Sequence, residues 1–214
     1  MHDLFLANIR VLITRGSELL SKLIAENLLH QGARVLLTDG KLHTVENFRS
    51  HFDSIYCLPF SLTEQGSVDT LIHDADEILN VCNTIINVIP LYKAESFFAI
   101  SPQDWDDAMS ESLKSSFLLC KNAVHDMLAS REGYIIHIYP KQPGNFLTES
   151  ISTALHAFSR SIAKEYGRKN IRSNDIVIDA ARLTEKDYLL EITKTVAFLL
   201  SGNASFVSGE IITV

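Results

Sequence analysis

Short apolar runs alternate with longer amphipathic segments along the whole chain. Seven short runs have the character of strands, at residues 9–14, 33–38, 54–60, 83–89, 133–139, 171–178 and 210–214. The segments between them repeat apolar residues at three- and four-residue spacing, as Leu20, Ile24 and Leu28 do, and this spacing predicts helices. Strands that are apolar throughout and covered by helices are typical of a parallel sheet buried on both faces. The pattern therefore predicts an α/β fold, with a doubly wound, seven-stranded parallel sheet flanked by helices.

The two longest helical patterns run from about residue 102 to 128 and from 148 to 167. Ser101 stands before Pro102, and this pair is a good helix start, because a serine hydroxyl can cap free N–H groups and proline suits the first turn.

Composition narrows the class of protein. The 214 residues are 46% hydrophobic and carry a formal net charge of -7, which argues against nucleic acid as a partner because that affinity rests on clustered Lys and Arg. No apolar run reaches the length of a membrane span and no signal peptide precedes the first strand. The chain is thus expected to be cytoplasmic, with neither nucleic acid nor membrane as partner.

Candidate metal ligands are scattered. Cys57, Cys82 and Cys120 form no CxxC pair, and the eight histidines form no HExxH spacing. We expect the cysteines to pack as small apolar residues, and we predict no metal site.

One family resemblance covers nearly the whole chain. The segments that carry it, in order, are residues 11–40, NTIINVIP, WDDAMSESLKSSFLLCKNAV, GYIIHIYP, residues 145–170, IRSNDI and AFLLSGNASFVSGEIITV. Together they resemble the short-chain dehydrogenase/reductase family. The resemblance implies a single Rossmann-like domain over 1–214, with a truncated substrate-loop region after NDIVIDAA.

The cofactor turn departs from the family pattern. The family's Thr-Gly-x-x-x-Gly-x-Gly lets the backbone approach a pyrophosphate at a helix N-terminus. Here the stretch is TRGSELLS, with Arg15, Leu19 and Ser21 at the glycine positions. Gly16 is displaced by one position. A leucine side chain at the close approach would occupy the space of the dinucleotide.

The other cofactor positions give opposite indications about NAD binding. Asp39, at the end of the second strand, matches the acid that binds an adenosine ribose, and it favours NAD. The acid before the adenine pocket corresponds to Ser61, followed by Leu62. Of the Asn-Asn-Ala-Gly signature only Asn87 remains. We therefore predict no cofactor-binding residues in this chain.

The family's catalytic positions also differ. Its tyrosine falls on Thr148, its lysine on Ser152, its serine on Pro140 and its asparagine on Ser112. A threonine hydroxyl is a far weaker acid than a phenol, and no cation lies one helical turn away. We therefore predict no catalytic residues.

Neighbouring side chains offer an alternative. Tyr139 and Lys141 flank Pro140, and Tyr139 alternates with His137 along a strand, so a displaced phenol and base are conceivable. Packing at the strand exit and a satisfied core histidine are the simpler interpretation.

These losses lead to a functional hypothesis. The chain is interpreted as a catalytically inactive subunit that assembles with an active paralogous NAD(P)-dependent dehydrogenase, as a heterotetramer in which NAD is bound by the partner. A hydroxyacyl-CoA dehydrogenase complex is one possible setting. The alternatives are a divergent NAD(P)-dependent oxidoreductase, a small-molecule-sensing module, or a structural homo-oligomer.

The expected interface comprises the helices near 102–128 and 148–167 and the C-terminal strand. The family pairs these elements across two-fold axes. Small residues that would allow close helix approach are Ser112, Ser115, Ser116, Ala154 and Ala157.

Overall fold

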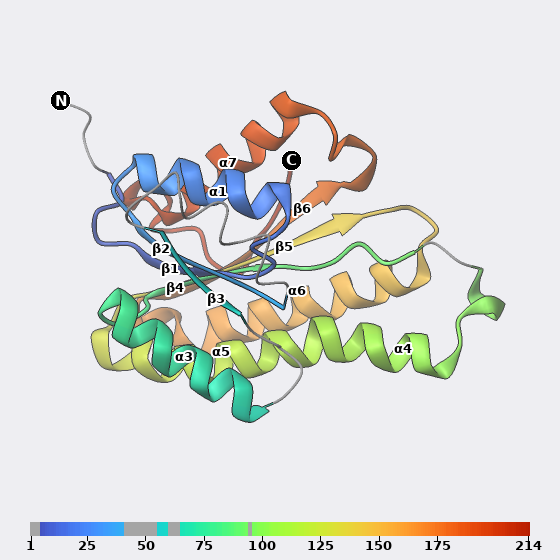
Figure 1. Cartoon of the computed structure of the whole chain (residues 1–214), viewed down its shortest axis with the longest axis horizontal. Coiled ribbons are helices and arrows are strands. Elements are labelled where there is room, and N and C mark those ends of the chain that lie inside the picture. The colour runs from blue at the N-terminus through green and yellow to red at the C-terminus, as the bar shows by residue number, and fades with distance from the viewer. Residues whose placement is uncertain (1–4, 41–54, 60–64, 94–95) are drawn as a thin grey trace.

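A parallel seven-stranded sheet forms the centre of the molecule (Figure 1). The computed structural model describes residues 5–40, 55–59, 65–93 and 96–214. The strand order is β3-β2-β1-β4-β5-β6-β7, with every neighbouring pair parallel. The strands are β1 (Arg10–Ile13), β2 (Arg34–Asp39), β3 (Ile55–Pro59), β4 (Thr84–Val88), β5 (Gly133–Lys141), β6 (Ile171–Asp179) and β7 (Ile211–Thr213). The predicted α/β architecture and its seven strands are confirmed.

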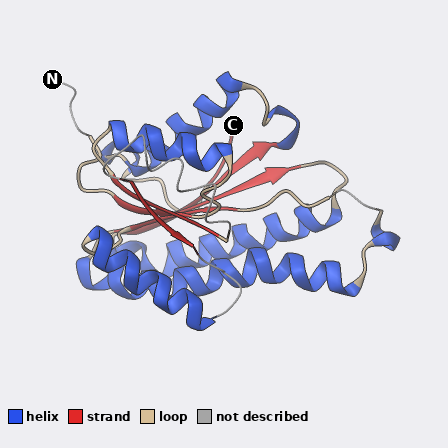
Figure 2. Cartoon of the chain, in the orientation of Figure 1, coloured by secondary structure: helices blue, strands red, loops and turns tan. Residues whose placement is uncertain are grey.

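Helices cover both faces of this sheet (Figure 2). One face carries α1 (Leu19–His30) and α7 (Lys186–Leu200). The other carries α3 (Gln65–Leu79), α4 (Pro102–Met109), α5 (Ser115–Ser130) and α6 (Phe146–Tyr166). A π-helical turn, η2 (Ser110–Lys114), joins α4 to α5, and single 3₁₀ turns are η1 (Phe97–Ala99), η3 (Gly167–Lys169), η4 (Ala180–Arg182) and η5 (Gly202–Ala204).

Side-chain alternation along the strands divides the core into two layers. Val11 and Ile13 pack against α1 and α7, whereas Leu12 between them packs toward α3 and α5. All three are fully buried, because successive strand residues point to opposite faces. A smaller third cluster lies under α4 and α6, at the end of the sheet where the candidate site is found.

The long pattern predicted for residues 102–128 is a helix with an interruption. Ser101 caps it as predicted, since its Oγ accepts a 3.1 Å hydrogen bond from the N–H of Asp104. The π turn at Ser110–Lys114 then adds a residue to one turn, a feature often found at functional sites.

Three small residues of this helix are buried. Ser112, Ser115 and Ser116 are all at most 1% exposed. Their burial places them against the protein's own core, so these three side chains pack within this chain.

The second long helix begins earlier than its pattern indicated. Asn145 caps α6 by accepting a hydrogen bond from the N–H of Thr148, so the helix starts at Phe146.

No helix among the described residues is both long and apolar enough to cross a bilayer.

Candidate functional site

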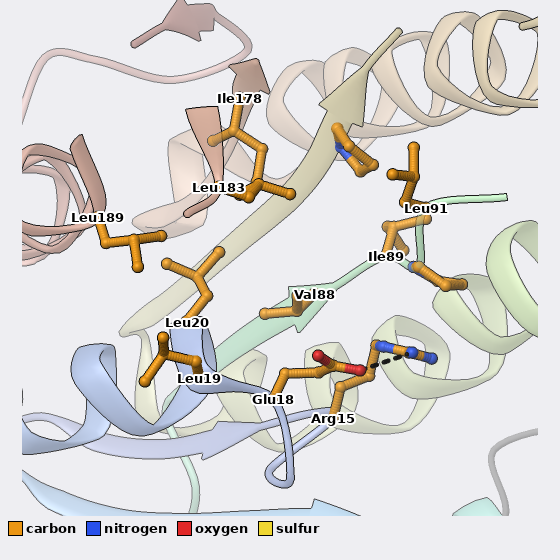
Figure 3. A pocket seen from close by; sticks show the side chains of 12 residues that line it. Arg15, Glu18, Leu19, Leu20, Val88, Ile89, Leu91, Ile178, Leu183 and Leu189 are labelled. Carbon is orange, nitrogen blue, oxygen red and sulfur yellow. Dashed lines mark hydrogen bonds and ion pairs between the residues drawn. The ribbon is translucent and has the colours of Figure 1, made fainter. Parts of the chain in front are cut away.

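The order of the strands creates a crevice at their carboxyl ends. The order in which strands are added to the sheet reverses between β1 and β4, and α/β sheets bind ligands in the crevice at such a point. A cleft of about 250 Å³ lies there. Its walls are Arg15, Glu18, Leu19, Leu20, Val88, Ile89, Pro90, Leu91, Pro140, Ile178, Leu183 and Leu189 (Figure 3). Apart from Arg15 and Glu18, every lining residue is apolar.

The turn from β1 to α1 keeps a tight backbone without the family's glycines. Arg15 adopts a left-handed conformation with φ of 54°, the region that glycine enters most easily. Gly16 has a different task, because an added Cβ would lie 2.8 Å from Leu37 Cβ. Its N–H donates to the Thr38 carbonyl at 2.9 Å, so Gly16 holds the turn close to β2.

Side chains fill the space above this turn. The Arg15 guanidinium forms ion pairs of 3.1 Å with both Glu18 and Glu111. Leu19 and Leu20, the first residues of α1, line the cleft, and Figure 3 shows them beside the Arg15–Glu18 pair. Ser21, at the third glycine position, donates its hydroxyl to the Thr14 carbonyl at 3.0 Å.

A buried hydrogen-bond chain supports the cleft from below. Thr14 Oγ1 donates to Asn87 Oδ1 at 2.9 Å and accepts from the Val88 N–H at 2.9 Å. Asn87 Nδ2 donates to Ser116 Oγ at 2.7 Å, and Ser116 Oγ donates to the Ser112 carbonyl at 2.6 Å. This chain connects β1, β4 and the π turn, and it explains why Asn87 is retained while its neighbours are apolar.

Asp39 has a partner inside the protein. Its Oδ2 accepts hydrogen bonds from the N–H of Ser17 at 2.9 Å and from the Ser17 hydroxyl at 2.6 Å. The carboxylate thus fixes the same turn that a dinucleotide would approach. Ser61 and Leu62, the other predicted cofactor positions, lie outside the described residues.

The cleft fits the parts of a nicotinamide dinucleotide unequally. Asp39 does not line the cleft and is bonded to Ser17, whereas the Arg15 side chain, 29% exposed, is a cation of the kind that pairs with phosphate. At the start of α1, however, the Leu19 side chain and the Glu18 carboxylate occupy the approach that glycines leave open. These residues do not fit a pyrophosphate held in the family's usual pose.

The four catalytic positions of the family do not converge on one point. Pro140 faces the cleft. Thr148 and Ser152 line another pocket, here called the α6 pocket, with Tyr139 and Lys141. Ser112 is buried, and its Oγ lies 2.5 Å from Tyr92 Oη.

Tyr92 is the residue that sequence reasoning missed. Its hydroxyl also lies 3.2 Å from the Ala108 carbonyl. Burial is the main cause that raises the pKa of Tyr92 well above its ordinary value, while the hydrogen bond to Ser112 lowers it. The phenol therefore stays protonated, and its hydroxyl donates to the Ala108 carbonyl. Its position two residues after Pro90, at the end of the fourth strand, was the available signal.

Tyr139 and Lys141 do not replace the missing groups at the cleft. Strand alternation turns both away from Pro140 and into the α6 pocket. Burial, followed by the nearby Asp175 carboxylate, raises the pKa of Tyr139. His137 is fully buried, with Nδ1 3.0 Å from Ser159 Oγ, which confirms its interpretation as a satisfied core histidine.

Comparison with known proteins establishes the family. The profile of the family described as Enoyl-(Acyl carrier protein) reductase matches residues 20–187. The chain belongs to the short-chain dehydrogenase/reductase family. Nodulation protein G of Rhizobium sp. (strain N33) is 25% identical over 95% of this chain and 94% of its own length. The 3-oxoacyl-[acyl-carrier-protein] reductase FabG of Aquifex aeolicus is 22% identical over 94% and 93%.

A solved structure shows the same fold. The gluconate 5-dehydrogenase from Burkholderia cenocepacia, in complex with NADP and tartrate, superposes with a TM-score of 0.89 at 18% identity. The match covers 100% of this chain and 96% of the dehydrogenase.

These relatives correct the functional hypothesis from sequence. The interpretation as a catalytically inactive subunit is wrong, because the family model is described as a reductase and FabG, matched over nearly its full length, is named as one. Replacement of the family's side chains at four positions does not by itself remove activity, since other hydrogen-bond donors can serve from different positions. The prediction that only a partner binds the cofactor depended on that hypothesis and is given up with it.

Proposed function

We propose that this chain is a divergent NAD(P)-dependent oxidoreductase that interconverts a carbonyl group and an alcohol. The observation that carries the proposal is that the family's fold is kept along the chain together with a cleft at the strand ends. Hydrogen bonds from Thr14 through Asn87 to Ser116 support this cleft. The names of the relatives, a 3-oxoacyl reductase and a gluconate dehydrogenase, suggest small carbonyl compounds as the substrate class.

In this proposal Arg15 takes over the role of the missing glycines. A phosphate would replace Glu18 as a partner of the guanidinium, because a bidentate Arg–phosphate pair is a strong charge-assisted interaction. Asp39 would accept from a ribose hydroxyl. Since a 2′-phosphate would meet the Asp39 carboxylate, NAD is preferred over NADP. The nicotinamide, when bound, would supply or accept the hydride.

Tyr92, which lines a neighbouring pocket with Ala108 and Glu111, is the proposed hydrogen-bond donor to the carbonyl oxygen, in exchange for its bond to the Ala108 carbonyl. Ser112, next to Glu111 on the π turn, holds the phenol oxygen at 2.5 Å. Glu111 also pairs with Arg15, so the phenol and the proposed phosphate ligand are joined through a single turn of the chain.

The test is a titration with NADH and with NADPH, followed by fluorescence and calorimetry. We expect saturable binding with NADH favoured, and about tenfold weaker binding for Arg15→Ala. Arg182→Ala is the matched control, because Arg182 forms an equivalent exposed pair with Glu185 at 3.1 Å. A flat titration with both cofactors at millimolar concentration would refute the proposal.

Turnover supplies the second readout. A panel of 3-oxoacyl thioesters and keto-sugar acids would be assayed through oxidation of NADH. Tyr92→Phe is expected to lower kcat by about 10²-fold with the binding of NADH unchanged. Full activity of this variant would exclude Tyr92 from the role.

A further inference from the structure

A group of aromatic side chains is exposed at the end of the molecule where α4 begins (Figure 1). Phe97 of η1 contacts Phe98 and Phe146, with ring centroids 5.6 and 4.9 Å apart. Trp105 of α4 contacts Phe146, the first residue of α6, at 6.0 Å. These four residues, called the aromatic cluster below, join η1, α4 and α6.

The aromatic cluster is open to solvent. Phe97 is 61% exposed, Phe98 95%, Phe146 39% and Trp105 37%. Single exposed apolar side chains are common on protein surfaces, whereas a contiguous exposed group marks an interaction site. Because the rings of the aromatic cluster contact one another, the cluster is of the contiguous kind.

The helix that carries Trp105 packs little against its own protein. Residues 102–107 are all exposed, and only Ala108 of α4 is buried. A surface helix ordinarily turns an apolar stripe toward the core. Ala108 and Met109 do so at the end of α4, whereas Trp105 remains partly in solvent. The start of α4 therefore presents apolar surface that this chain does not cover.

Carboxylates border the aromatic cluster. Asp104, Asp106 and Asp107 flank Trp105 on α4 and are exposed, and this helix contains no Lys or Arg. Lys93 interacts with Asp104 and offsets one of the three charges. The surface around Trp105 is therefore negatively charged.

This combination selects the sign of the partner. Aromatic faces attract ammonium and guanidinium groups through cation–π contacts, and carboxylates pair with the same groups. Nucleic acid and anionic membrane surfaces carry the charge that the aspartates repel. A partner that offers apolar side chains together with cations complements the surface.

We propose that the aromatic cluster and the aspartates of α4 form a docking surface for a basic, amphipathic segment of another protein. Apolar side chains of the segment would pack on Phe97 and Phe98. Its Lys or Arg side chains would pair with Asp106 and Asp107 and stack on Trp105. The inference rests on this surface and does not depend on the proposed cofactor or on the carbonyl chemistry.

Trp105 supplies the readout, because it is the single tryptophan of the chain. The full-length protein would be titrated with a synthetic helical peptide that has leucines on one face and lysines on the other, followed by tryptophan fluorescence. A peptide of the same pattern with glutamates in place of the lysines is the control. We expect saturable binding of the lysine peptide, and binding at least about tenfold weaker for the glutamate peptide. Added sodium chloride should weaken the first, because salt screens exposed charges.

A variant of the aromatic cluster tests the apolar contact. Phe98→Ser should weaken the lysine peptide about tenfold, because exposed aromatic side chains are common anchors of interfaces. Phe206→Ser is the matched control, since Phe206 is 84% exposed and follows η5, outside the aromatic cluster.

A charge variant tests the aspartates. Asp106→Asn combined with Asp107→Asn should weaken the lysine peptide about tenfold and reduce its dependence on salt. Asp187→Asn combined with Glu191→Gln removes two exposed charges from α7 and should leave the binding unchanged. All these positions are on the surface, so the variants should remain folded, as circular dichroism would verify.

Four results would overturn the proposal. They are equal binding of the two peptides, no saturable change at millimolar lysine peptide, unchanged binding in Phe98→Ser, and unchanged binding in the double aspartate variant. Light scattering coupled to size exclusion tests the remaining occupant. A lower mass for Phe98→Ser than for the unaltered protein would show that a second copy of this chain occupies the surface, and it would overturn the proposal as well. None of these results bears on the cofactor titration.

Discussion

The cleft and the α6 pocket use neighbouring residues of the same strands for different chemistry. Pro140 and Ile178 face the cleft, where only Arg15 and Glu18 interrupt an apolar lining. Tyr139 and Lys141 face the α6 pocket, where most lining residues are polar. The family's catalytic positions on α6 are altered, yet polar side chains remain concentrated on that side of the sheet. A site can therefore lack the family's catalytic side chains and still present mostly polar groups.

A buried carboxylate supports the polar side. Asp175 is fully buried on β6. Its carboxylate accepts from Ser159 Oγ at 2.6 Å and lies 3.0 Å from His156 Nδ1 and 3.5 Å from His137 Nδ1. One charge therefore orders three side chains of β5 and α6.

Removing this carboxylate should have the largest effect on stability. Asp175→Ala is expected to lower the free energy of unfolding by about 3 kcal/mol or more, because it leaves buried donors without partners. Urea unfolding followed by circular dichroism measures the change. Asp69→Ala is the control, since Asp69 is exposed and accepts a single bond from Asn122 at 2.8 Å. Equal losses in both variants would mean that the buried network contributes nothing special.

Alkaline pH should lower the stability of the fold, by less than the loss of the Asp175 carboxylate does. Burial raises the pKa of Tyr92 and of Tyr139 above the ordinary value of 10.0. Above about pH 10 the unfolded chain loses phenolic protons that the folded chain keeps, so stability is full below that pH and falls as pH rises. Tyr92→Phe should flatten the fall in urea midpoint across this window. An unchanged pH slope would show that the phenol is not desolvated.

The outer surface of α6 should contribute least to the stability of the monomer. We propose that the outward faces of α5 and α6 form an assembly surface with a second family chain, identical or paralogous. Phe117 is 48% exposed there, beside a pocket of about 280 Å³ that Phe158 also lines. Ala154, one helical turn before Phe158, is half-buried.

Ala154→Trp should therefore disrupt assembly while changing the free energy of unfolding by less than about 0.5 kcal/mol. Light scattering coupled to size exclusion measures the mass. Ala181→Trp, at an exposed position far from this surface in sequence, is the control. An assembly of undiminished mass in the first variant would place the interface elsewhere.

Prediction from sequence was accurate for elements and weak for the site. The helix caps at Ser101 and Asn145 depend on neighbours within a few residues. Local pattern was sufficient to predict the cap at Ser101, whereas the start of α6 at Asn145 was placed too late. Asp39 was singled out as a match to the ribose-binding acid, but its bonds to Ser17 across 22 positions were not foreseen. Tyr92 was missed because its link to Ser112 spans 20 positions and belongs to no motif.

The sequence by itself determined the α/β class, the seven strands and the family, because apolar periodicity and the order of segments persist when individual motifs are lost. Only the tertiary structure decided which side of the sheet each group serves. Pairing of β5 with β6 in one register turns Pro140 to the cleft and Tyr139 to the α6 pocket. That register is fixed by packing between distant segments, and a shift of one residue would exchange the two faces.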